Sequence, residues 1–83
     1  MKLNDGIAVT TTDYGGVLLD QRAGTYWQLN ETATVIAIAA AQGLTPAKAV
    51  DRLVAAFDVT RPQAESDVRA LTDQLVAAKL ATP

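Results

Sequence analysis

The 83-residue chain contains neither cysteine nor histidine. Their absence removes disulfide bonds, thiolate nucleophiles, imidazole bases and the usual ligands of zinc. The remaining side chains offer no evident pair of nucleophile and base, and no glycine-rich phosphate loop is present. The sequence therefore predicts a protein that is not an enzyme and that needs no cofactor.

Aromatic residues and net charge are also scarce. Aromatics make up 5% of the chain, and seven basic residues stand against nine acidic ones for a net charge of -2. Scattered charge of this sign does not attract a phosphate backbone. No apolar run approaches the ~20 residues of a membrane span, and the N-terminus lacks the apolar core of a signal peptide. We expect a cytoplasmic protein with no nucleic-acid and no membrane partner.

The length predicts one small domain over residues 1–83. A chain of this size buries about 60–65% of its unfolded surface, which leaves little room for a deep catalytic cavity. Hydrophobic residues make up 49% of the composition, and alanine and valine are abundant among them. We therefore expect a thin core between closely approaching helices.

The first third of the chain has the pattern of a three-stranded antiparallel meander. The runs Ile7–Thr12, Gly16–Asp20 and Thr25–Leu29 are rich in strand-forming residues. Asp13–Gly16 and Gln21–Gly24 separate them, and both contain the glycines that tight turns require.

A buried helix is predicted directly after the third strand. Asn30 suits an N-cap, and Glu31 places a negative charge in the first turn, where it favours the helix dipole. The residues up to Ala41 are apolar almost all round, which is typical of a central helix. Gly43 can adopt the left-handed backbone conformation that commonly ends a helix.

Two amphipathic helices are predicted to follow. Thr45 and Pro46 have the residue types of an N-cap and a first helical position. The apolar face expected for this second helix consists of Ala47, Val50, Leu53, Val54 and Phe57. The third helix opens at Thr60–Gln63 with a capping-box-like arrangement and runs through Leu80. Its apolar stripe is Ala64, Val68, Leu71, Leu75 and Ala78.

Together these elements predict an α+β fold of the winged helix-turn-helix type, with a three-stranded sheet followed by three helices. The third strand would lie at an edge, and the third helix would form a groove with it. The candidate peptide-binding residues are Thr25, Tyr26, Trp27, Gln28 and Leu29 on the strand, with Asp67, Val68, Leu71, Gln74 and Leu75 on the helix. An edge strand gives affinity by backbone pairing, and a groove selects side chains.

Several of these assignments have plainer alternatives. The stripe residues Val68, Leu71 and Leu75 equally fit an ordinary core, and Asp67 fits a solvated surface. Tyr26 and Trp27 must point to opposite faces of the strand, but the sequence leaves open which of them packs on the helices. Arg61 and Arg69 fit either partners for an acidic peptide residue or unpaired surface charges.

The chain resembles the PqqD-like family of peptide-recognition domains. The resemblance lies in Leu29-Asn30 followed by Glu31-Thr32-Ala33, in Gly43 at the end of the first helix, and in the restart Thr45–Val50. It covers nearly the whole chain. One departure is at Ile36–Ile38, where many relatives carry a tryptophan.

This resemblance implies a stand-alone recognition element of ribosomally made peptide biosynthesis, most similar to the leader-binding proteins of lasso peptide pathways. In such proteins the leader of a precursor peptide adds as a strand to the third strand, and a separate leader peptidase then cuts it. The implied partners are therefore the leader region, the leader peptidase and, as a further candidate, a lasso cyclase. An exposed edge strand also leaves room for a weak homodimer.

Two other functions fit less well. A DNA-binding winged helix would use Arg61, Arg69 and Lys79 on the third helix. Its local charge is near zero, however, because the helix also carries Glu65, Asp67 and Asp73. A carrier protein would need a serine for a prosthetic group. Ser66 lies between Glu65 and Asp67 and lacks the Asp-Ser-Leu pattern of such sites.

Overall fold

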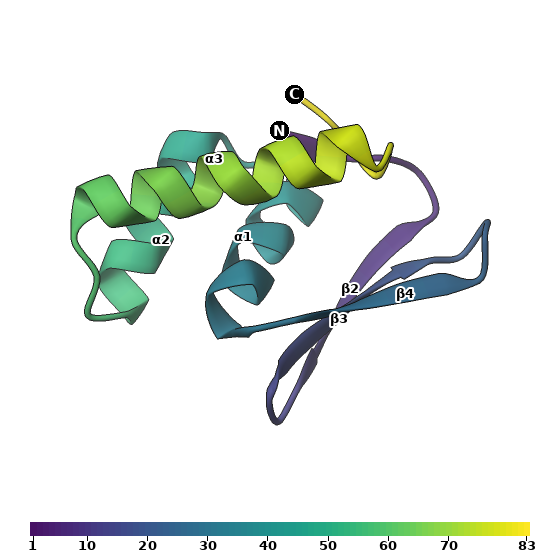
Figure 1. Ribbon diagram of the computed structural model, residues 1–83, viewed down its shortest axis with the longest axis horizontal. Coiled ribbons are helices and arrows are strands. Elements are labelled where there is room, and N and C mark those ends of the chain that lie inside the picture. Colours follow the sequence, from purple (N-terminus) through teal and green to yellow (C-terminus); the bar gives the residue numbers. More distant parts are fainter.

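The computed structural model describes residues 1–83 and shows the predicted α+β arrangement, a three-stranded antiparallel sheet followed by three helices (Figure 1). The strands are β2 (Ile7–Thr12), β3 (Gly15–Asp20) and β4 (Thr25–Leu29), and the helices are α1 (Glu31–Ala41), α2 (Pro46–Ala56) and α3 (Arg61–Ala77). None of these helices combines the length and the apolar character that a membrane crossing requires.

The sheet has the order β2-β3-β4, so that β3 is central and β4 lies at an edge, as predicted. β3 begins at Gly15, one residue earlier than expected. Gly15 has φ +142°, and a Cβ atom there would collide with the carbonyl oxygen of Leu29. The hairpin can therefore turn tightly beneath the end of β4 only because this residue is glycine.

Helix α1 packs closely on the sheet through a second glycine. A Cβ atom on Gly16 would lie 2.7 Å from Oγ1 of Thr34, so the bare backbone of β3 lets α1 approach. The Thr34 hydroxyl, buried at this contact, donates to the carbonyl of Asn30 at 2.7 Å. The expected N-cap is also present, since Oδ1 of Asn30 accepts from the N–H of Ala33 at 2.8 Å. Packing and capping together fix α1 at the point where β4 ends.

The core consists of two clusters on either side of α1. One joins α1 to α2 and α3 through Ile36, Ala39, Ala49, Val50, Leu53, Ala64 and Val68. The other joins α1 to the sheet, the end of α3 and both chain termini through Leu3, Leu18, Ala40, Leu75, Leu80 and Ala81. Alanines supply much of this surface, which confirms the expected thin core between closely packed helices.

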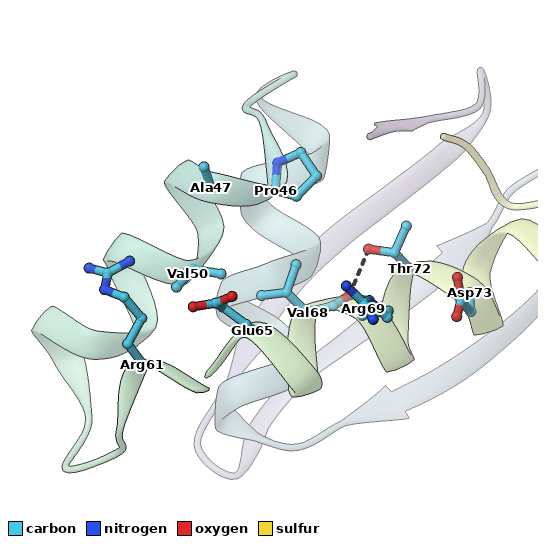
Figure 2. Close-up of a pocket in the computed structure, with 9 residues that line it drawn as sticks. All are labelled: Pro46, Ala47, Val50, Arg61, Glu65, Val68, Arg69, Thr72 and Asp73. Atoms are coloured by element: carbon cyan, nitrogen blue, oxygen red, sulfur yellow. Dashed lines mark hydrogen bonds between the residues drawn. The ribbon is translucent and has the colours of Figure 1, made fainter. Parts of the chain in front are cut away.

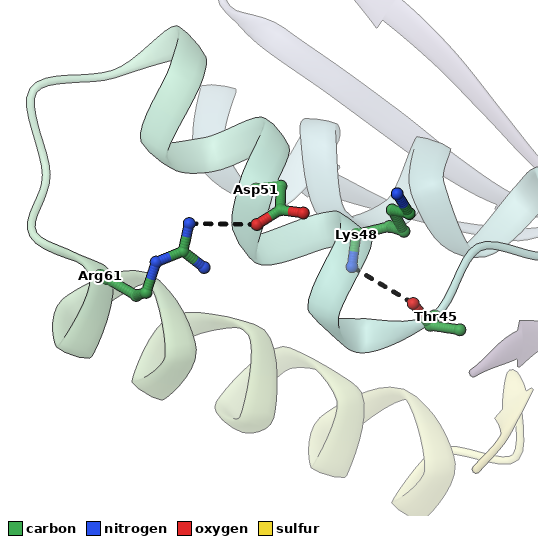
Figure 3. A network of polar contacts seen from close by, with 4 residues as sticks. All are labelled: Thr45, Lys48, Asp51 and Arg61. Carbon is green, nitrogen blue, oxygen red and sulfur yellow. Dashed lines mark hydrogen bonds and ion pairs between the residues drawn. The ribbon is translucent and has the colours of Figure 1, made fainter.

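Helices α2 and α3 pack side by side and leave a groove between them (Figure 2). At one end of this groove the guanidinium of Arg61 pairs with the carboxylate of Asp51 at 3.1 Å (Figure 3). Both side chains are about half exposed, so this ion pair contributes at most about 1 kcal/mol. The N-cap of α2 is confirmed, because Oγ1 of Thr45 accepts from the N–H of Lys48 at 3.3 Å.

The prediction that α3 runs through Leu80 is wrong. The helix ends at Ala77, and Lys79 adopts the left-handed conformation with φ 62°. The N–H of Leu80 then reaches back to the carbonyl of Leu75 at 2.9 Å, and that of Lys79 to Val76 at 3.0 Å. This is a Schellman ending with lysine at the position that usually holds glycine.

A second, two-stranded sheet was not predicted. Strand β1 (Lys2–Leu3) pairs antiparallel with β5 (Ala81–Thr82) and brings the two termini together (Figure 1). Asn4 strengthens this junction, since its side chain donates to the carbonyl of Lys79 and its backbone N–H to that of Leu80, both at 2.9 Å.

Three details of the predicted helices are wrong. Ala47 and Ala78 are exposed, and Ala49 takes the expected place of Ala47 in the core. Oγ1 of Thr60 caps α3 by accepting from the N–H of Gln63 at 3.3 Å. The side-chain amide of Gln63, however, donates to Asp67 at 2.8 Å, so the return bond of a capping box is absent.

Candidate functional site

Strand β4 presents an open edge. It pairs only with β3, and its five residues include no proline and no charged side chain, so it has none of the usual features that block edge-to-edge pairing. The pairing of β2 with β3 shows which backbone groups of β4 point away from the sheet. The N–H of Gln21 donates to the carbonyl of Gly6 at 2.9 Å, which fixes the alternation of bonds along β3.

This alternation directs the backbone groups of Gly16, Leu18 and Asp20 toward β4. Their partners in the register are Leu29, Trp27 and Thr25, respectively. The residues between these partners, Tyr26 and Gln28, therefore point their N–H and C=O groups away from the sheet. An added strand would pair with Tyr26 and Gln28.

The structure decides the question of Tyr26 and Trp27. Trp27 lies opposite Leu18, which is fully buried against the helices, so Trp27 is on the helix-facing side. Tyr26 lies opposite Leu19 on the outer side. Neither residue is fully covered, since Trp27 is 41% exposed and Tyr26 is 65% exposed. Both aromatic side chains are available to a partner at the edge.

A hollow of about 180 Å³ adjoins the end of β4, between the first turns of α1 and the middle of α3. It is lined by Asn30, Thr32, Ala33, Ile36, Asp67, Ala70, Leu71 and Gln74. Ile36 and the half-buried Leu71 give it apolar walls, and the amide of Gln74 and the carboxylate of Asp67 lie at its polar side. A strand on β4 that continued past Leu29 would reach this hollow.

The candidate residues on α3 fall into two groups. Asp67, Leu71 and Gln74 line the hollow, as a groove requires. Val68 and Leu75 are only 2% and 5% exposed and belong to the two core clusters, so for these two the core alternative is correct. Both hold α3 in place behind the hollow.

The groove also differs from the expected one in its second wall. That wall comes mainly from the start of α1, with Asn30 as the link to β4. The candidate residues did not include Asn30, Thr32, Ala33 and Ile36, because their residue types indicated helix capping and core packing. Their position in the sequence could have identified them as neighbours of the edge strand, because the first turn of α1 follows β4 without a loop.

The family model of the coenzyme PQQ synthesis protein D (PqqD) matches residues 15–81, which include strands β3 and β4 and all three helices. The chain belongs to the PqqD family. The resemblance inferred from the sequence is thereby confirmed.

Two solved structures are similar to this PqqD-family protein over nearly its whole length. A lasso peptide synthetase B1 complexed with the leader peptide is 43% identical, with a TM-score of 0.80 and coverage of 99% of this chain and 96% of the other. TbiB1 in complex with the TbiA(beta) leader peptide is 31% identical, with a TM-score of 0.81 and coverage of 96% and 93%. A search of curated proteins gave no match.

Proposed function

We propose that this PqqD-family protein binds the leader segment of a ribosomally made precursor peptide of the lasso type and presents it to a leader peptidase. One observation carries most of the weight. A structure of 43% identity that spans the same fold is a lasso peptide synthetase B1 complexed with the leader peptide. The open edge of β4 in this chain supplies the physical means of such binding.

The leader binds by adding a strand to β4. Its backbone pairs with the outward groups of Tyr26 and Gln28, and each such hydrogen bond contributes about 0.5–1.5 kcal/mol net. Alternate leader side chains then lie on the side of Trp27 and on the side of Tyr26. Backbone pairing of this kind gives affinity but little selectivity.

Selectivity comes from the hollow beside the edge. An apolar leader side chain contacts Leu71 and Ile36, and its burial is worth on the order of 1.5–3 kcal/mol. Asp67 and Gln74 offer an acceptor and an amide to polar atoms at the rim. One anchor and a few backbone bonds, less the cost of ordering the peptide, are consistent with micromolar affinity.

The role is that of an adaptor rather than a catalyst, and it belongs in the cytoplasm, where a ribosomal precursor is made. The DNA-binding alternative gains no support from the comparisons, since both similar structures contain leader peptides. The local charge of α3 also opposes it, because acidic residues alternate with its arginines.

Trp27 provides the experiment that tests this function, because it is the only tryptophan and lies partly exposed at the proposed edge. A leader peptide from a lasso precursor is titrated into the protein while the tryptophan emission is followed. A saturable change with leader, and none with duplex DNA, is expected. A salt-sensitive response to duplex alone would refute leader recognition.

A further inference from the structure

A second hollow, larger than the one beside β4, does not belong to the proposed leader site. It is the α2–α3 groove of Figure 2, about 490 Å³ in volume, and it lies between the start of α2 and the first three turns of α3. Its floor is apolar and is formed by Val50 and Val68, with Ala47 on the α2 rim. The hollow beside β4 uses other positions of α3, namely Asp67, Ala70, Leu71 and Gln74. The two depressions therefore lie on different faces of α3.

The α3 rim of this groove carries a row of charges. Glu65, Arg69 and Asp73 follow one another at four-residue spacing, which places them on one line along the helix. All three are exposed, and none forms an ion pair within 4.0 Å. Arg61, the next residue on the same line, is already paired with Asp51. The unpaired rim thus presents the order negative, positive, negative.

The groove suits a helix better than a strand. The backbone groups of α2 and α3 are used within their own helices, so a strand laid between them would leave its N–H and C=O groups without partners. A helix satisfies its own backbone and needs only side-chain contacts. It would rest an apolar ridge on the exposed Ala47, above the nearly buried Val50 and Val68, and charges at the same four-residue spacing would face the rim.

We propose that the α2–α3 groove docks an amphipathic helix of the peptidase that cuts the presented leader. This inference rests on the proposed leader-binding function. Charge complementarity requires the docking helix to carry a base, an acid and a base, opposite Glu65, Arg69 and Asp73 in turn. Because this order reads the same in both directions, it fits a helix of either polarity.

The placement accounts for how one small domain holds two partners at once. The leader occupies the β4 edge and the hollow on one side of α3, while the peptidase contacts the other side. Neither partner needs the exposed residues of the other site. The cleavage site of the precursor is then held near the enzyme at a raised effective concentration.

The test measures the affinity of the purified leader-bound protein for its leader peptidase. Arg69→Glu reverses the central rim charge, and we expect at least about fivefold weaker peptidase binding. Arg52→Glu is the matched control, since Arg52 is an exposed arginine of α2 that does not line the groove. Leader affinity, followed by Trp27 emission, is expected to remain unchanged in both variants.

A second pair of variants tests the apolar contact at the α2 rim without changing charge. Ala47→Gln places a larger polar side chain at the groove rim, and Ala55→Gln makes the same change at an exposed alanine of α2 outside the groove. Only Ala47→Gln is expected to weaken peptidase binding and slow leader cleavage, again by about fivefold.

The outcomes separate this inference from the proposed function. If wild-type protein fails to bind leader before peptidase is added, the proposed function itself fails. If leader binds but both groove variants bind peptidase as wild type does, the groove proposal is overturned. Loss of leader affinity in Arg69→Glu would assign the groove to the leader instead. A dimer that these variants dissociate, seen by sedimentation, would assign it to a second copy of the chain.

Discussion

Replacing Gln28 by proline tests strand addition most sharply. The N–H of Gln28 points away from β3, so proline removes no hydrogen bond of the sheet and is tolerated at such an edge position. An added leader strand, in contrast, loses one backbone bond and leaves one of its carbonyls unpaired beside the proline ring. Removing one partner of a hydrogen bond and leaving the other unpaired costs about 1–3 kcal/mol. We therefore expect roughly 5-fold to 150-fold weaker leader binding.

Thr11→Pro is the matched control. Thr11 lies on β2, the opposite edge of the same sheet, and the same alternation turns its N–H outward. Both variants are first checked for the wild-type circular dichroism spectrum, and leader affinity is then measured by titration calorimetry. Gln28→Pro should lose affinity while Thr11→Pro retains it. A folded Gln28→Pro variant that binds leader as tightly as wild type would refute strand addition at β4.

Three further predictions concern the hollow and the packing of the fold. Leu71→Ala should weaken leader binding by about 1–2 kcal/mol. Leu44→Ala is an equal truncation of a half-buried leucine away from the hollow and should leave leader affinity unchanged. Equal losses of affinity in the two titrations would argue against leader binding in the hollow. Lys79→Val should destabilise the protein by about 1–2 kcal/mol in urea unfolding, because a β-branched residue disfavours φ 62°. Lys79→Gly should not destabilise it. Equal stabilities of the two variants would contradict the left-handed conformation at the end of α3. Gly16→Ala should cost about 1–3 kcal/mol, because the new Cβ atom would collide with Thr34 and with the carbonyl oxygen of Thr10. Thr34→Ala should then cost less in the Gly16→Ala background than in the wild type, and strict additivity of the two changes would exclude the contact with Thr34.

The sheet and the helix starts were predictable because their signals are local. Strand-forming runs between glycine turns gave β2 to β4 within one residue, and Asn30, Thr45 and Thr60 cap the helices that they were expected to cap. Such signals depend on residues close in sequence, and so a single chain displays them.

The end of α3 and the second sheet were not predictable in the same way. Strands of two residues, such as Lys2–Leu3, are too short to show a periodicity. The left-handed Lys79 replaces the glycine that usually marks a helix end, and its carbonyl accepts a hydrogen bond from Asn4 at the other end of the sequence. Both features depend on contacts between the N-terminal and C-terminal residues, which are far apart in the sequence.

The edge position of β4 was predictable from the sequence, whereas the lining of the hollow beside it was predictable only in part. The stripe of α3 included Leu71, which lines the hollow, but it did not separate Leu71 from the buried Val68 and Leu75, because burial depends on which helices cover each position. Alanine posed the same problem on α2, where Ala47 and Ala49 have equal hydrophobicity but opposite exposure. Composition indicates how much surface is buried, and packing decides where.

Amide hydrogen exchange at residue resolution, with and without the leader peptide, shows directly whether leader adds to β4 as a strand. We expect the outward-pointing amides of Tyr26 and Gln28 to exchange rapidly in the free protein and to become protected in the complex, while Thr11 on the opposite edge does not change. Saturating leader that protects β2, or that leaves Tyr26 and Gln28 unprotected, would contradict strand addition at β4.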